Sequence, residues 1–189
     1  MKHSVGTGFE AGGEAVANGR ETAGIAFTNT YLFEAYDSQG NLKWTEEVKN
    51  TVVNVGLDDV LDKYLKGSAY TAAFYVGLTD GTPTPAATDV MSSHAGWTEV
   101  TAYQHSPDVR PDLTLGTVSG QSVDNSASKA SFSINADTTT VGGAFITTDS
   151  TKGGTAGTLY SIAAFTAADK SLDSGDTLNV TCTLTAASA

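Results

Sequence analysis

Histidine, cysteine and serine could carry chemistry in this 189-residue chain, but their spacing matches no common catalytic or metal-binding pattern. The histidines are His3, His94 and His105, and the single cysteine is Cys182. They form neither an HxH nor an HExxH pattern, so we expect no zinc site. Ser92-Ser93-His94 brings hydroxyls next to an imidazole, but adjacent loop side chains rarely point toward one another, and the GxSxG motif is absent. The sequence therefore predicts no nucleophilic active site.

Carboxylates are numerous, and one lies where a sugar-binding site could form. Residues 97–103 alternate in a way that predicts a strand with Trp97, Glu99, Thr101 and Tyr103 on one face. The other acids lie mostly in turns, where aspartates usually bond to the local backbone; they are Asp80, Asp89, Asp124, Asp137, Asp149, Asp173 and Asp176. A carbohydrate-binding or adhesin module using Trp97, Glu99 and Tyr103 stays open as an alternative, as does calcium in a turn.

Phosphate chemistry has no support in the glycines. Gly6-Thr-Gly8 and Gly12-Gly13 lack both the lysine and the strand–helix context of a P-loop. With no motif class matched, we expect a protein that is not an enzyme, with no catalytic residues, no cofactor and no bound metal.

Composition and charge point to a β-rich chain without a nucleic-acid partner. Hydrophobic residues make up 40% and charged residues only 16%, and the formal net charge is −11 with a pI near 4.4. Such an acidic surface repels phosphate backbones. The N-terminal residues lack the apolar run of a signal peptide, and no window is apolar enough to span a membrane. We expect synthesis in the cytoplasm and no membrane partner.

The elements that must position these residues are mainly strands. Residues 25–49 predict a β-hairpin with a turn at 37–41. One side of its first strand carries Phe27, Asn29, Tyr31, Phe33 and Ala35. Strands are also predicted within residues 72–186, at 73–78, 130–136, 142–148, 158–165 and 178–184. In the last of these Cys182 shares an apolar face with Leu178, Val180 and Leu184, which makes a buried thiol the expected role.

One amphipathic helix is predicted over residues 55–66. Asn54 can cap it, the aspartates come early and the lysines late, and Gly67 suits its end. Its apolar face, which we expect to pack on the sheets, comprises Leu57, Val60, Leu61, Tyr64 and Leu65. Together these elements predict a mainly β fold: a single antiparallel β-sandwich or jelly-roll-like domain over residues 25–189 with one helix.

Residues 1–24 predict a Gly-rich, extended N-terminal arm. They contain six glycines, and their apolar residues follow neither a helical nor a strand period. We expect the arm to contact a neighbouring subunit, with Phe9, Val16, Ile25 and Phe27 as assembly contacts. Ile25 and Phe27 can alternatively begin the core of the domain itself.

Two stretches carry a resemblance to a known class of proteins. The first, residues 49–63, runs from a strand into the helix through Asn54-Val-Gly-Leu57; the second starts at Ser93-His-Ala-Gly-Trp-Thr-Glu99, passes Arg110-Pro111 and ends at residues 170–178. In this order, over residues 30–186, the chain resembles small virion proteins of tailed double-stranded DNA phages, among them head decoration or cement proteins.

The resemblance implies a decoration protein on the capsid surface of the virion that binds the major capsid protein and stabilises contacts between its subunits. It also implies a homo-oligomer, commonly a trimer, with no catalytic residues to transfer. A phage tail or fibre component is the alternative within the same class.

Overall fold

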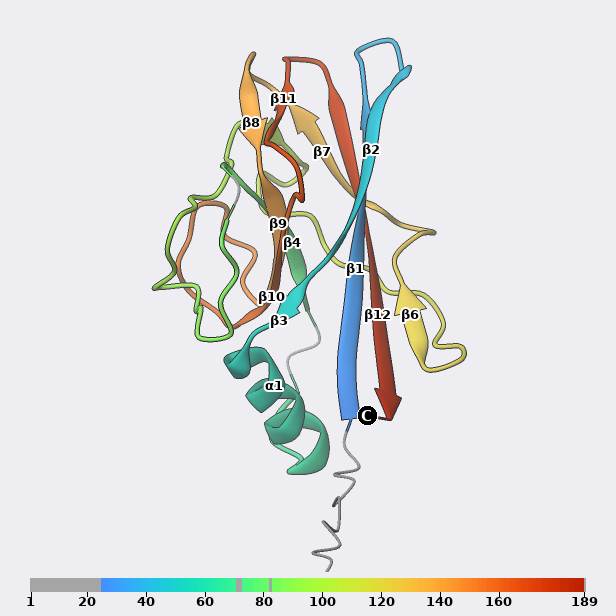
Figure 1. The fold of residues 1–189 in the computed structure, drawn as a ribbon, viewed down its shortest axis with the longest axis vertical. Coiled ribbons are helices and arrows are strands. Elements are labelled where there is room, and N and C mark those ends of the chain that lie inside the picture. The colour runs from blue at the N-terminus through green and yellow to red at the C-terminus, as the bar shows by residue number, and fades with distance from the viewer. Residues whose placement is uncertain (1–24, 71–72, 82, 189) are drawn as a thin grey trace, which may run out of the picture.

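The computed structural model of the chain describes residues 25–70, 73–81 and 83–188, and its fold is mainly β (Figure 1). The larger sheet has the order β2-β1-β12-β7-β5, and the short β6 also pairs with β12. Its strands are β1 (Ile25–Tyr36), β2 (Leu42–Lys49), β5 (Tyr103–Gln104), β6 (Ser122–Asp124), β7 (Ala130–Ile134) and β12 (Thr177–Ser188). The two longest, β1 and β12, pair antiparallel from Ile25↔Ser188 to Tyr36↔Thr177. β1 also pairs antiparallel with β2, from Thr30↔Lys49 to Tyr36↔Leu42, which confirms the predicted hairpin. The start of β1 and the end of β12 lie together at the helical end of the molecule.

A second sheet packs against the first and makes the predicted antiparallel sandwich. Its order is β3-β10-β9-β4, and a two-stranded β11-β8 ribbon lies beyond it. The strands are β3 (Thr51–Val52), β4 (Tyr75–Thr79), β8 (Thr139–Val141), β9 (Gly143–Thr147), β10 (Leu159–Ala164) and β11 (Lys170–Leu172). A buried hydrogen bond between the hydroxyls of Tyr31 and Ser161 links β1 to β10. Every strand pairing is antiparallel among the residues described.

The hydrophobic core has two parts, one on each side of β9 and β10. The main part fills the space between the sheets and includes Tyr31, Phe33, Phe132 and the free thiol of Cys182. The smaller part lies under the long loops that follow β4, and consists of Val53, Met91, Trp97, Phe145, Leu159 and Ile162. Because both faces of β9 are covered, its five residues are all buried, as a continuous apolar run predicts.

Residues 97–103 do not form the predicted strand. Only Tyr103 and Gln104 are in a strand, and Trp97, Val100 and Tyr103 are buried at intervals of three. Thr101 is exposed, so the proposed single face does not exist. The segment crosses between the sheets: the Val100 amide donates to Leu78 of β4, and Tyr103 pairs with Ile134 of β7. Burial on two different surfaces is the reason that the alternation was misleading.

The helix lies where it was predicted, in two consecutive parts: α1 (Asn54–Val60), and a wider π-helical turn, η1 (Leu61–Leu65). The capping prediction was wrong, because Val53 is the N-cap residue and no side chain caps the first turn. Asn54 is the first helical residue, and its amide donates to the carbonyl of Ala87. Gly67, with φ +79°, ends the helix as expected. Within the described residues, no helix is long and apolar enough to cross a membrane.

Candidate functional site

The most distinctive surface feature is an apolar groove lined by residues of the helix, the start of β1 and the end of β12. Figure 1 shows these elements together at one end of the molecule. We call this groove the helix groove; it has a volume of about 620 Å³ and is lined by Ile25, Phe27, Leu57, Val60, Leu61, Tyr64, Leu65 and Ala186. Tyr64 is 84% exposed, Ile25 71%, Leu65 67% and Leu61 54%. Large apolar side chains gathered in this way mark an interaction site more often than a solvent-facing surface.

Two smaller apolar hollows extend the helix groove on either side. One, of about 240 Å³, shares Val60 and Tyr64 with it and reaches Tyr70, Phe74 and Leu115. The other, of about 200 Å³, shares Phe27 and Ala186 with it and reaches Val118 on the loop before β6. The three hollows form one continuous apolar surface around this end of the chain.

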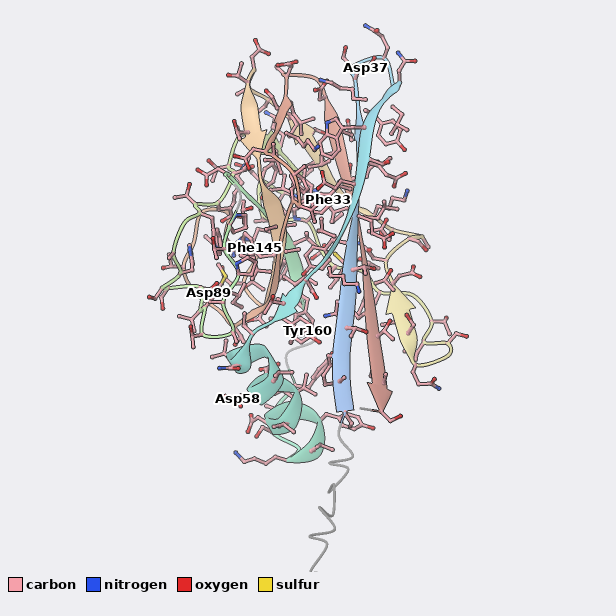
Figure 2. The ribbon with its side chains drawn as sticks, viewed as in Figure 1. Phe33, Asp37, Asp58, Asp89, Phe145 and Tyr160 are labelled. Atoms are coloured by element: carbon pink, nitrogen blue, oxygen red, sulfur yellow. The ribbon has the colours of Figure 1, made fainter. Side chains whose placement is uncertain are left out.

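The exposed helix face corrects the expectation that this face packs on the sheets. The helix is fixed at its first turn, where Gly56 is buried against the backbone of Tyr160 in β10. A Cβ atom at Gly56 would lie 2.4 Å from the carbonyl oxygen of Tyr160, so the close approach requires glycine. Beyond this turn the helix runs past the end of the β3-β10-β9-β4 sheet, as Figure 2 shows with Tyr160 beside the helix and Asp58 on its outer side. Leu61, Tyr64 and Leu65 of η1 face the ends of β1 and β12 across the helix groove and stay more than half exposed.

The structure brings two of the four predicted assembly residues together. Ile25 and Phe27 both line the helix groove, although their role as contacts with another chain stays a prediction. The alternative, that they begin the core of the domain, fits neither side chain, because Ile25 is mostly exposed and Phe27 only partly buried. Phe9 and Val16 lie outside the described residues.

The aromatic residue proposed for sugar binding is in the core. Trp97 is only 6% exposed; its ring stacks on the His94 imidazole at a centroid distance of 3.6 Å and contacts Phe145. Burial lowers the pKa of His94, with Asp89 acting in the opposite direction. Ser92-Ser93-His94 thus belongs to a loop that covers the smaller core. The sugar-binding alternative loses the exposed aromatic platform on which it depended.

Glu99 is an ion-pair partner, and both oxygens of its carboxylate accept hydrogen bonds within the chain. Nε and Nη2 of Arg110 donate to its two oxygens at 2.8 Å each, and the Gly153 amide donates at 2.6 Å. Arg110 is fully buried and also donates to the carbonyls of Asp149 and Gly154. The sequence contained both residues, but their pairing follows only from the chain path.

Some turn aspartates bond to the local backbone as predicted, whereas Asp80, Asp137 and Asp173 accept from amides that are distant in sequence. Asp37 accepts from the amides of Gln39 and Asn41, and Asp124 accepts from the Ser126 amide. Asp176 is buried in the turn before β12, where it accepts from the Asp173 amide and from Nζ of Lys43 at 2.6 Å. In the described part of the chain, no three His, Cys, Asp or Glu side chains group closely enough to hold a metal ion.

A polar hollow of about 570 Å³ is open to solvent, but the charged lysine that lines it is already paired within the chain. It is lined by Gln104, His105, Ser106, Asp108, Ser131, Ser133, Asn135 and Lys152. Nζ of Lys152 is already bound to the Asp108 carboxylate and to the carbonyl of Tyr103. Its cation is therefore engaged within the chain, which leaves the helix groove as the candidate site.

Comparisons with protein-family models, with curated proteins and with solved structures give no match.

Proposed function

We propose that this chain is a structural protein of a tailed-phage particle, a decoration protein that binds the outer capsid shell and stabilises contacts between major capsid subunits. The helix groove is the observation that carries the proposal, because it is an exposed apolar surface made by a well-anchored helix. The ordered resemblance at residues 49–63 and 93–178 supports the assignment to a virion. A homo-oligomer, a trimer by the same resemblance, is part of the proposal.

The size of the exposed surface is adequate for attachment. Full burial of one Leu or Phe side chain contributes about 1.5–3 kcal/mol. Leu61, Tyr64 and Leu65 are each more than half exposed, so a partner that covers all three gains part of this burial free energy from each of them. Attachment by apolar contact needs no reaction, in agreement with the engaged carboxylate of Glu99 and the stacked ring of His94.

The location in the particle is tested by immunogold labelling of purified particles of the phage whose genome encodes the chain. A decoration protein is expected to give label at many positions over the head. Label confined to the tail would contradict decoration and favour the tail or fibre alternative. Purified particles without label and without peptides of the chain would contradict any virion role.

The attachment surface is tested with Leu61→Glu in a binding assay on capsid shells that lack the chain. A charge in the helix groove is expected to weaken attachment at least about tenfold, or ~1.4 kcal/mol. Leu61 is 54% exposed, so the free energy of unfolding should change by less than about 0.5 kcal/mol. Asn54→Glu adds the same charge at an exposed position of the same helix and should attach normally. Equal attachment by both variants would exclude the helix groove.

A further inference from the structure

The helix groove lies at the point where the described chain begins. Ile25 is the first residue of β1 and is itself part of the groove lining. Residues 1–24 therefore join the described chain directly beside this apolar surface. Their own apolar side chains include Phe9 and Val16, separated from Ile25 by a stretch that contains Gly19 and Gly24.

We propose that, in the free chain, residues 1–24 fold back over the helix groove of the same molecule, with Phe9 and Val16 entering it. The proposal concerns the isolated chain and holds for any assembly partner. In the assembled state the partner takes the place of this segment, which releases Phe9 and Val16 for the contacts expected of them with a neighbour.

The segment is long enough. Val16 precedes Ile25 by nine residues, which in a Gly-rich chain span about 15–18 Å on average and about 30 Å at full extension. The twelve helical residues from Asn54 to Leu65 span about 18 Å at 1.5 Å per residue. Val16 can thus reach any part of the helix groove, and Phe9 has a still longer tether.

Tethering favours the groove of the same chain over that of another copy. A short flexible linker provides an effective concentration of about 1 mM, roughly a hundredfold above a 10 µM solution of separate copies. Binding of the segment to the groove of a second copy would be favoured only if the tether were too short to reach the groove of its own chain. The reach calculated above is long enough, so binding within one chain is favoured.

The cover should be reversible, as an assembly surface requires. Burying Phe9 and Val16 favours the contact, whereas the conformational entropy lost when the residues around them become ordered opposes it. A partner that offers a larger apolar contact can therefore displace the segment.

Disulfide trapping in the full chain tests the contact directly. The single native cysteine, Cys182, is fully buried, so introduced cysteines are the reactive ones. Phe9→Cys is combined with Leu61→Cys in the helix groove and, as a matched control, with Asp58→Cys on the exposed polar face of the same helix. We expect an intrachain disulfide to form at least fivefold faster with Leu61→Cys than with Asp58→Cys. Equal rates, or a disulfide that forms only between two chains, would overturn the proposal.

A dye that fluoresces on exposed apolar surfaces gives a second readout without cysteines. Phe9→Asp combined with Val16→Asp should uncover the helix groove and raise dye fluorescence several-fold over the natural sequence. Thr7→Asp combined with Asn18→Asp adds the same charge at polar positions of the same segment and should leave fluorescence unchanged. Identical fluorescence for the two double variants would also overturn the proposal. Neither experiment uses phage particles, so this inference and the proposed function can fail independently.

Discussion

At the scale of single residues, Arg110 holds together segments that are distant in sequence. Its guanidinium is fully buried and joins Glu99, the carbonyl of Asp149 and the carbonyl of Gly154, with its charge near the Phe145 ring at 5.3 Å. Planar, bidentate recognition of a carboxylate is the geometry for which arginine is suited. Within this chain Arg110 fixes the loops over the smaller core.

Arg110→Met should destabilise the fold by about 3–5 kcal/mol, because it leaves the Glu99 carboxylate buried without its partner. Glu99 has 7% of its side chain exposed, so water cannot compensate. The free energy of unfolding in urea measures the effect. Arg110→Met combined with Glu99→Gln should lose less stability than the single variant, and Lys66→Met, which removes an exposed charge, should lose far less than Arg110→Met. A double variant as unstable as the single one would contradict this account of the pair.

At the scale of elements, the helix is fixed at one end and projects at the other. Gly56 brings its first turn onto β10, and the turn that contains Val53 is buried in the smaller core. The η1 part has no such support, since Leu61, Tyr64 and Leu65 are exposed. This arrangement presents an apolar face at a defined angle to the sandwich, as a binding surface needs to be presented.

Gly56→Ala tests the anchoring. Alanine favours helices over glycine by about 1 kcal/mol, so an unconstrained site would become more stable. Here the added Cβ meets the backbone of Tyr160, and we expect a net loss of about 1–3 kcal/mol in urea unfolding. Asp58→Ala, on the exposed side of the same helix, should change stability by less than about 0.5 kcal/mol. A stabilising Gly56→Ala would mean that the helix does not approach β10 this closely.

At the scale of the whole molecule, the net charge is −11, and local hydrogen bonds lower the pKa of Glu34, Asp37, Asp62 and Asp124. The pKa of Glu34 is lowered by its hydrogen bond from Lys129, and that of Asp62 by its hydrogen bond from Lys66. The pKa of Asp37 is lowered by Asn41, and that of Asp124 by Ser126. These interactions cover both ends of the molecule, since Asp37 lies at the hairpin turn far from the helix (Figure 2).

Stability should therefore fall in acid. The ordinary pKa values are 4.5 for Glu and 3.8 for Asp. Below them the unfolded chain binds more protons than the folded chain, whose carboxyl pKa values are lower, so the free energy of unfolding decreases as pH decreases. The urea midpoint is expected to be lower at pH 3 than at pH 7, with a smaller difference in Glu34→Gln. An unchanged midpoint at pH 3 would contradict the lowered pKa values.

The sequence by itself determined the elements whose residues face one surface throughout. In β1 alternate residues from Asn29 to Ala35 are buried, and in β12 the apolar residues Leu178, Val180 and Cys182 are buried, with Thr181 buried between them. The period of two in the apolar residues of both strands is visible without the structure. The helix has a period close to 3.6 and a terminating Gly67, and its position was likewise predictable. The buried thiol of Cys182 followed from the same alternation.

Only the tertiary structure decided what each apolar face contacts. Residues 97–103 contact two sheets in turn, so their pattern mixed two surfaces and predicted a strand that is not there. The helix pattern predicted an apolar face but could not say that much of this face stays exposed. Periodicity shows where apolar side chains recur and does not show what covers them. The pairing of Arg110 with Glu99 and the gathering of Ile25 with Leu61 depend on the path of the chain, which local sequence does not encode.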